Sequence, residues 1–223
     1  MELYQNKTSS YFSNTRLDLI SVLPSAKIDR LLEVGAGSGD TLVEIKRRGL
    51  AQHVTGFELM RLPGTNQENA FIDTFIYCDL ERVESELPKA SFDVIICGDV
   101  LEHLVDPWRI LQKLTALLRP DGTIIISCPN VRHYRMFWAI FVRGSFLYTD
   151  FGLLDRTHLR FFCKKDLLSM VEGAGLHRCE VIPTFKFYKR SLASIVNTIT
   201  FGIFEQFLAL QYVITAKSKS ISL

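Results

Sequence analysis

The sequence has no long apolar run and no segment of low complexity. Its first ten residues are polar, without the basic start and apolar centre of a signal peptide, so we expect no secretion. The longest apolar stretches, 134–142 and 191–208, are shorter or more interrupted than the ~20-residue run of a membrane-spanning helix. Internal repeats are absent as well, and 48% hydrophobic residues are typical of a globular chain. These absences argue against disordered, fibrous and membrane-spanning proteins.

Paired cysteines are missing too. The five cysteines form an odd set without a CxxC spacing. They are Cys78, Cys97, Cys128, Cys163 and Cys179. Three of them lie in or beside apolar, strand-like runs, so we expect reduced and mostly buried thiols in a cytoplasmic protein.

The net charge of +2 is small, but the two signs are unevenly distributed. Residues 1–130 hold 13 Lys and Arg against 18 Asp and Glu, whereas residues 131–223 hold 13 against 6. A basic later part favours an anionic partner, since a surface of one sign concentrates ligands of the other. A solvated basic surface without a partner explains the same counts equally well.

Apolar runs rich in β-branched residues alternate with segments of helical spacing through the first 130 residues. The runs predicted as strands are 31–34, 54–57, 71–77, 92–97 and 123–128. Helices are predicted over 16–23, 41–48 and 107–118, the last with Asp106 as its cap and Pro107 at its first position. This alternation predicts a Rossmann-like, doubly wound α/β fold with a mostly parallel sheet.

The regular alternation of predicted strands and helices ends after residue 130. We expect a helix near 164–174, a strand near 179–182, a long apolar helix over roughly 191–208 and a last strand at 211–216. The final two strands are expected to pair antiparallel, which gives a seven-stranded sheet with an antiparallel last strand. At this length we predict one domain, 1–223, with an N-terminal helical cap at 1–28 and cap insertions at 131–175 and 186–209.

A glycine-rich turn follows the first predicted strand. Residues 31–40 read LLEVGAGSGD, an apolar strand running into three glycines and then a helix. Such a turn allows tight backbone geometry and close approach of a ligand to the helix N-terminus. Counted from Gly35, the sixth position is Asp40, where a dinucleotide-binding loop has glycine and where an acid would meet a pyrophosphate. The spacing therefore argues against NAD.

This pattern resembles motif I of class I S-adenosylmethionine-dependent methyltransferases, and the resemblance extends over most of the chain. It implies S-adenosylmethionine as cofactor and S-adenosylhomocysteine as product. In that family the acid after the second strand, here Glu58, accepts from the ribose hydroxyls, and the acid after the third, here Asp79, accepts from the adenine amino group. The implied cofactor-binding residues are Glu33, Gly35, Ala36, Gly37, Gly39, Glu58, Leu59, Asp79, Leu80, Cys97 and Gly98.

Tyr11 and Arg16 are similar to a Tyr-x-x-x-x-Arg element that precedes motif I in such enzymes. The resemblance implies that they close over the cofactor carboxylate. An exposed aromatic ring and a solvated arginine are an equally good interpretation.

The segment 99–103 reads DVLEH and follows the fourth predicted strand, at the sheet edge where doubly wound folds bind ligands. Methyl transfer to a hydroxyl needs a base, and His103 is the first candidate, with Asp99 beside it. The segment resembles the Glu-x-x-Glu-His element of ubiquinone-biosynthesis O-methyltransferases, in which acids and a histidine can hold a divalent cation. Here Asp99, Glu102 and His103 are the corresponding residues, but a metal is not the favoured interpretation.

A second cluster of ionisable and aromatic residues lies in 149–162, which reads TDFGLLDRTHLRFF. Together with 127–133 it resembles methyltransferases that accompany bacterial surface-polysaccharide biosynthesis. In that interpretation His158 is a rival base, and Arg156, Arg160 and Asn130 bind the acceptor. The alternative is that Asp155 and the arginines form an ion pair that only folds the loop.

These features predict a methyltransferase that acts on a sugar or other small-molecule hydroxyl in glycan biosynthesis. The acceptor is expected to be small, and an anionic or lipid-linked precursor would use the basic later half. An RNA methyltransferase is the less favoured alternative, because Gly98 to Leu101 replaces the Asn/Asp-Pro-Pro-aromatic element of amino-group methylases. A non-catalytic cofactor-binding scaffold is the third hypothesis. A homodimer, or contact with the inner face of the membrane through 191–208, stays open.

Overall fold

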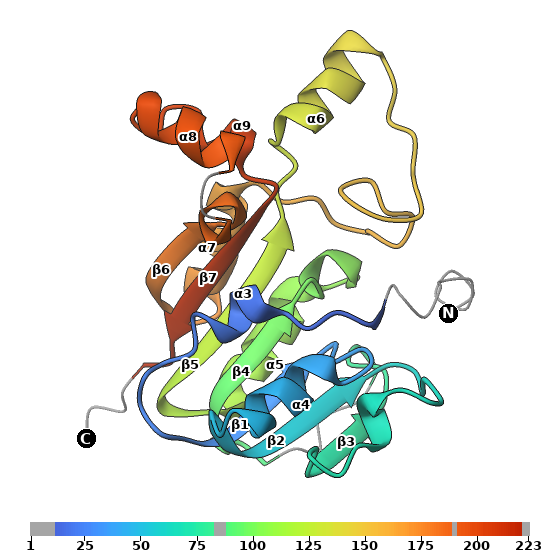
Figure 1. Cartoon of the computed structure of the whole chain (residues 1–223), viewed down its shortest axis with the longest axis vertical. Coiled ribbons are helices and arrows are strands. Elements are labelled where there is room, and N and C mark those ends of the chain that lie inside the picture. The colour runs from blue at the N-terminus through green and yellow to red at the C-terminus, as the bar shows by residue number, and fades with distance from the viewer. Residues whose placement is uncertain (1–11, 83–87, 189–190, 220–223) are drawn as a thin grey trace.

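The computed structural model describes residues 12–82, 88–188 and 191–219. Seven strands form one sheet in the order β3-β2-β1-β4-β5-β7-β6 (Figure 1). They are β1 (Ile28–Val34), β2 (Ala51–Glu58), β3 (Thr74–Tyr77), β4 (Phe92–Gly98), β5 (Leu118–Pro129), β6 (His177–Pro183) and β7 (Gln211–Lys217). β7 is antiparallel to both neighbours, while the pairs among β1 to β5 are parallel. The predicted Rossmann-like sheet with an antiparallel last strand is confirmed.

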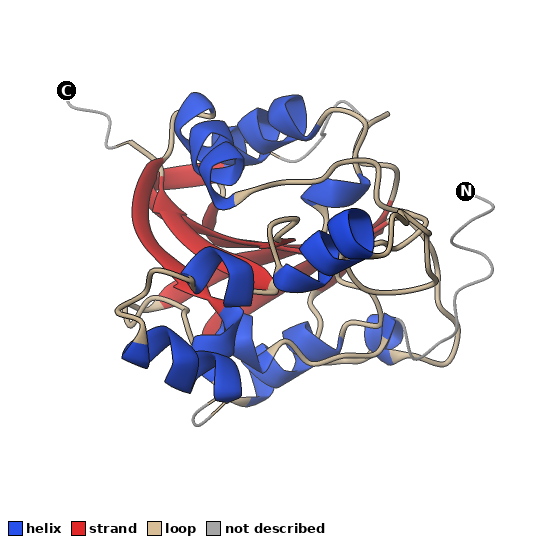
Figure 2. Cartoon of the chain, turned by 90° about the horizontal axis from the view of Figure 1, so that it is seen from above, coloured by secondary structure: helices blue, strands red, loops and turns tan. Residues whose placement is uncertain are grey.

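Helices cover both faces of this sheet (Figure 2). On one face are α3 (Leu17–Ile20) and α4 (Asp40–Arg47), and on the other α5 (Pro107–Leu117) and α7 (Lys164–Gly173). Successive residues of the central strands point into opposite cores, so that Val94 and Ile96 pack with α4 and Ile95 with α5. Burial on both faces explains why these strands consist of continuous apolar runs.

The local signals at α5 are confirmed. The Asp106 side chain accepts a hydrogen bond from the Arg109 amide at 3.1 Å, and Pro107 is the first helical residue. Other boundaries differ from the prediction: α3 is shorter than 16–23, and β3 begins only at Thr74, after a turn that holds the exposed Phe71. Short 3₁₀ helices occupy Asn66–Glu68, Leu101–His103 and Thr184–Phe187.

The cysteines described are free thiols, and two of them are buried, as expected. Cys97 on β4 and Cys128 on β5 lie in the apolar core. Burial raises the pKa of both thiols, so they are inert components of the core.

Two helical segments extend beyond the sheet, at the top of Figure 1. The first is α6 (Tyr134–Phe137) with the π-helical turn Trp138–Val142, and the second is α8 (Leu192–Ile199) with α9 (Glu205–Leu208). The prediction of one helix over 191–208 was wrong. Phe201 and Gly202 have φ of 50° and 80°, outside the helical range, and separate α8 from α9. Among the described residues, no helix is both long and apolar enough to cross a membrane.

Candidate active site

The glycine turn connects β1 to α4 at the carboxyl edge of the sheet. Gly35, Gly37 and Gly39 have φ of 69°, 51° and 84°, a region that other residues rarely adopt. A Cβ on Gly37 would lie 2.7 Å from the main-chain oxygen of Phe12, and one on Gly35 would lie 2.5 Å from a methyl group of Val100. The turn is therefore built so that only glycine fits.

Glu58, at the end of β2, holds this turn in place. Its Oε2 accepts a hydrogen bond from the Gly37 amide at 2.8 Å, and its Oε1 accepts one from the Leu59 amide at 2.7 Å. Burial raises the pKa of the Glu58 carboxyl, and these main-chain donors oppose the rise. A carboxylate has about four acceptor positions, so both oxygens can still accept from a diol.

Glu33 is a buried acid with an unpaired oxygen. It lies on β1 next to the turn and is 5% exposed, and in the described part of the chain its Oε2 has no hydrogen-bond partner. Burial raises the pKa of Glu33 to about 8, although the Arg16 charge and the Thr41 hydroxyl oppose the rise. An orphaned carboxylate oxygen beside a glycine turn fits a ligand that brings a positive charge.

Arg16 enters the same site from the N-terminal segment. Its Nη1 donates to Asp99 Oδ2 at 2.6 Å, and its guanidinium makes a two-pronged contact with Asp18 at 2.8 and 3.0 Å. Its Nη2 also donates to the Ser127 hydroxyl at 3.1 Å. Arg16 is therefore not the solvated arginine of the alternative interpretation. Tyr11, its predicted companion, lies outside the described residues.

Both carboxylate oxygens of Asp99 accept hydrogen bonds, which does not suit the predicted role of a base or metal ligand. Besides Arg16, Ser127 donates to its Oδ1 at 2.8 Å and the Gln211 amide donates at 3.2 Å. Its φ of 54° turns the chain sharply at the end of β4. Asp99 thus orients Arg16 and joins the ends of β4, β5 and β7.

The remaining predicted cofactor residues lie along the same edge of the sheet. Cys78 pairs with the end of β2, so that Asp79 follows next to Glu58, and an ion pair of 3.1 Å joins Asp79 to Arg82. At the end of β4, a Cβ on Gly98 would lie 2.7 Å from a methyl group of Leu19. The strand order 3-2-1-4 thus aligns the ends of four strands that are distant in sequence.

The two candidate bases are neighbours. The ring centroids of His103 and His158 are 4.8 Å apart, although 54 residues separate them. Nδ1 of His103 lies 3.0 Å from the Thr157 carbonyl oxygen, and Nδ1 of His158 lies 3.1 Å from the Leu153 carbonyl oxygen. Burial, together with the nearby His158, lowers the pKa of His103 to about 4. His103 is therefore neutral at physiological pH.

The predicted metal set is not the one that the structure gathers. Glu102, His103 and His158 offer ligand atoms within 4.8 Å of one another, and Asp99 is not among them. Glu102 is 1% exposed, and burial raises its pKa well above the usual range. Mg²⁺ prefers water and ionised carboxylate oxygens, so its binding here would have to overcome the burial that favours the protonated form of Glu102. The Glu102 carbonyl accepts from the amides of Leu159 and Arg160 at 2.8 and 3.0 Å, which anchors the 149–162 loop.

The three predicted acceptor-binding residues have structural partners. Asn130 is fully buried and its amide donates to the carbonyls of Gln206 and Ala209 at 2.7 and 2.8 Å, which corrects its predicted role. The Arg160 guanidinium donates to the Val105 carbonyl.

Arg156 makes an exposed ion pair with Asp150 at 3.1 Å. The expected pair with Asp155 is not the one described, since Asp155 accepts from Thr157 instead. Arg156 is thus the most exposed of the three predicted acceptor-binding residues.

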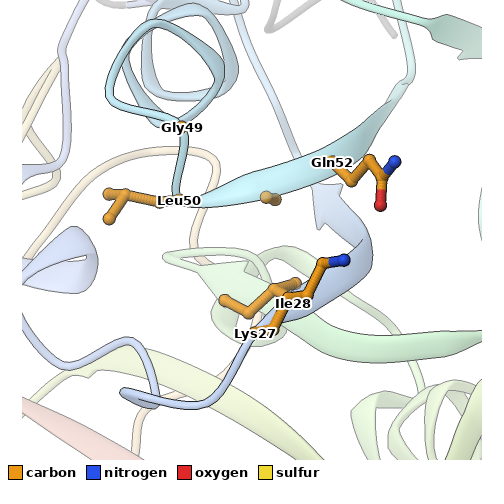
Figure 3. Close-up of a pocket in the computed structure, with 6 residues that line it drawn as sticks. Lys27, Ile28, Gly49, Leu50 and Gln52 are labelled. Atoms are coloured by element: carbon orange, nitrogen blue, oxygen red, sulfur yellow. The ribbon is translucent and has the colours of Figure 1, made fainter.

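One surface pocket lies far from this edge. It has a volume of about 360 Å³ and is lined by residues at the amino ends of β1 and β2, among them Lys27, Leu50 and Gln52 (Figure 3). The glycine turn is at the opposite ends of the same strands. In doubly wound folds ligands bind at the carboxyl edge, so this pocket is not the cofactor site.

Comparison with known proteins identifies the family. A model of the methyltransferase domain family matches residues 6–180. The chain is a class I S-adenosylmethionine-dependent methyltransferase. The unpaired Glu33 oxygen and the glycine turn fit its cofactor, which has an ammonium and a sulfonium group.

Curated relatives of this methyltransferase include ubiquinone biosynthesis O-methyltransferases. The protein of Aeromonas salmonicida is 29% identical over 152 residues, which cover 66% of this chain and 62% of that protein. That of Xylella fastidiosa is 31% identical over 169 residues, covering 73% and 66%. The chain therefore spans less than two thirds of the length of these relatives.

Solved structures share the fold at low identity. An S-adenosylmethionine-dependent methyltransferase from Mesorhizobium loti has a TM-score of 0.61 at 14% identity, covering 95% of this chain and 99% of that one. The [4+2]-cyclase SpnF has a TM-score of 0.62 at 16% identity, covering 95% and 81%. A cyclase among the neighbours illustrates that the fold alone does not determine the reaction.

Sequence reasoning missed two residues of the site. Ser127 lies near the end of β5 and pairs with Gly98 at the end of β4, so its place in a predicted strand beside a predicted site strand could have indicated it. Gln211 reaches the site only because β7 is antiparallel and begins at the carboxyl edge of its neighbour β5. No local sequence pattern predicts that Gln211 lies in the site.

Proposed function

We propose that this methyltransferase transfers the methyl group to a hydroxyl oxygen of a small molecule, with sugar hydroxyls of glycan precursors as the first acceptor class. The observation that supports this is the neutral His103 beside the end of β4. A hydroxyl becomes a good nucleophile only when its proton is removed, and a neutral imidazole in reach of the acceptor can take it.

Different residues of the chain bind the cofactor and accept the proton. Glu58 and the glycine turn bind the cofactor, Glu33 balances its positive charge, and S-adenosylmethionine supplies an electrophilic methyl group when bound. Nδ1 of His103 faces the Thr157 carbonyl and is therefore the protonated nitrogen, which makes Nε2 the atom that accepts the hydroxyl proton. The adjacent His158 disfavours a lasting imidazolium, so the proton passes on to solvent after transfer.

The relatives support an oxygen acceptor. Those of Aeromonas and Xylella are O-methyltransferases of ubiquinone biosynthesis by name. The DVLEH segment of this chain, 99–103, resembles the Glu-x-x-Glu-His element of those enzymes. A phenolic hydroxyl is consequently the second acceptor class to test.

The test is release of S-adenosylhomocysteine with a panel of nucleotide-linked sugars, lipid-linked sugars and phenols. His103→Asn retains an amide near the position of Nδ1 and removes the base. We expect it to lower kcat about 10²- to 10⁴-fold, the usual contribution of general base catalysis, with little change in cofactor affinity. The matched variant His158→Asn tests whether His158, rather than His103, is the base.

A His103→Asn enzyme with wild-type kcat would refute the role of His103. If every hydroxyl acceptor failed while an amine acceptor reacted, the proposal of O-methylation itself would be wrong.

A further inference from the structure

Exposed apolar side chains are concentrated in two segments outside the sheet. Among the described residues, 24 large hydrophobic side chains are exposed, and 17 of them lie in 134–151 (ten) and 191–210 (seven). Phe201 is 93% exposed, Phe151 77% and Leu192 76%. Contiguous apolar patches of this kind on soluble proteins mark interaction sites. We call these two segments together the apolar cap.

The apolar cap lies on one side of the molecule. The segment with α6 leaves β5 at its carboxyl end, and the segment with α8 and α9 leads into β7, whose start lies at the same edge (Figure 1). Arg132 joins the bases of the two segments, since its Nη1 donates to Gln206 Oε1 at 2.5 Å and its guanidinium lies 5.2 Å from the Phe207 ring centroid. The cap is therefore next to the cofactor edge of the sheet.

Its helices are apolar but only partly packed: Ala193 of α8 and Leu208 of α9 contact the buried cluster of Phe185, Ala209 and Tyr212. None of the residues of α8, of α9 or of the π-helical turn 138–142 is buried. A helix of this composition normally hides its apolar face against a core. Here Leu192, Ile195 and Ile199 of α8 stay exposed, and no described helix is both long and apolar enough to span a bilayer. This combination is typical of helices that lie in the plane of a membrane surface.

The charges around the cap have one sign. No Asp or Glu occurs in 122–149 or in 181–204, whereas Arg135, Arg143 and Lys186 are exposed there. The two acids inside the cap are each paired with a basic side chain: Asp150 with Arg156, and Glu205 with Lys164 at 2.7 Å.

We propose that the apolar cap docks this methyltransferase on the surface of an anionic phospholipid bilayer. Apolar side chains such as Phe201 and Phe141 would enter the boundary of the acyl chains, and the surrounding arginines and lysines would meet the headgroups. The aromatic rings of Trp138 and Tyr134 are of the kind that favours this interface. Two copies packed cap to cap would instead bring like charges together, which disfavours a dimer as the occupant. The inference does not depend on the acceptor.

The test is co-sedimentation of the full chain with sucrose-loaded vesicles, either phosphatidylcholine alone or phosphatidylcholine with 30% phosphatidylglycerol. We expect binding to the anionic vesicles that weakens with salt. The double variant Phe201→Ser and Ile203→Ser is expected to lower the partition coefficient at least tenfold, and Arg135→Glu with Arg143→Glu to do the same. The matched control is Phe71→Ser, an exposed apolar residue outside the cap, which should bind like the wild type.

A second measurement places the cap in the bilayer. The chain has two tryptophans, so Trp108→Phe leaves Trp138 as the only reporter. Its emission should shift to shorter wavelength with anionic vesicles and be quenched by brominated acyl chains. Binding of S-adenosylhomocysteine by each variant verifies that it is folded.

Three outcomes would overturn the proposal. One is absence of vesicle binding, and another is equal binding to both vesicle types. The third is a dimer in solution that the Phe201→Ser and Ile203→Ser substitutions dissociate without any vesicle binding, since a second copy would then be the occupant.

Discussion

The raised pKa of Glu33 predicts that cofactor binding releases a proton. In the unliganded protein burial holds its pKa at about 8, so the carboxyl is protonated at pH 7. The ammonium group of bound S-adenosylhomocysteine would lie near the unpaired oxygen and stabilise the ionised form, which lowers the pKa. Binding must then release the proton of Glu33.

The size of the effect follows from that pKa. If the pKa falls below 5 in the complex, about 0.9 proton is released at pH 7, and the affinity rises about eight- to ninefold from pH 6 to pH 7. In this window the ligand ammonium stays mostly protonated, and His103, whose pKa is about 4, does not titrate. The stability of the unliganded protein changes in the opposite direction. Because the folded state binds this proton more tightly than the unfolded chain, stability falls as the pH rises from about 4.5 to about 8.

The assay is titration calorimetry at pH 7 in phosphate and in Tris, whose ionisation enthalpies differ, together with dissociation constants from pH 6 to pH 7. Glu33→Gln keeps the shape of the side chain without the titrating group and should show no proton release and a flat profile. The reasoning is refuted if the wild type has a flat profile, or if Glu33→Gln has the same slope as the wild type.

Further predictions concern the turn, the ribose site and metal dependence. Gly37→Ala and Gly64→Ala both place a side chain at positive φ, at a cost of about 1–2 kcal/mol, but only Gly37 meets a main-chain oxygen. Calorimetry should therefore show that Gly37→Ala loses S-adenosylhomocysteine affinity at least tenfold while Gly64→Ala retains it. Glu58→Gln leaves one buried amide without an acceptor, so thermal unfolding should reveal a loss of about 1–3 kcal/mol, with cofactor affinity at least tenfold weaker. Unchanged stability would contradict that reading of Glu58. EDTA should leave the rate of methyl transfer within twofold, because burial favours the protonated form of Glu102, which binds metals poorly, and a rate restored only by Mg²⁺ would refute this.

The sequence by itself determined the features that depend only on residues close together in the chain. The alternation of apolar runs and helical segments predicted the sheet, because strands covered on both faces must be continuously apolar. The GAGSG turn predicted the cofactor position, since three residues at positive φ after a strand require glycine. Asp106 and Pro107 predicted the start of α5 because a helix cap acts within one turn.

Only the tertiary structure decided which distant residues meet. The Arg16 contact with Asp99 spans 83 residues of sequence and the Gln211 contact spans 112, and each depends on the order of strands in the sheet. Asn130 was assigned to the acceptor through the family resemblance of 127–133, but the β5 to β7 pairing buries it against the 206–209 carbonyls.

In the apolar segment 191–208, too, the local sequence determined one property and the tertiary structure another. Its composition indicated a helix, yet whether its apolar face is covered depends on what the rest of the chain places against it. In this fold only Ala193 of α8 packs against a buried cluster while Leu192, Ile195 and Ile199 stay exposed, and the chain turns at Phe201 and Gly202. Local sequence fixes the conformations that each segment prefers. Burial and partner choice are properties of the assembled sheet, because they arise from contacts between segments that no local pattern encodes.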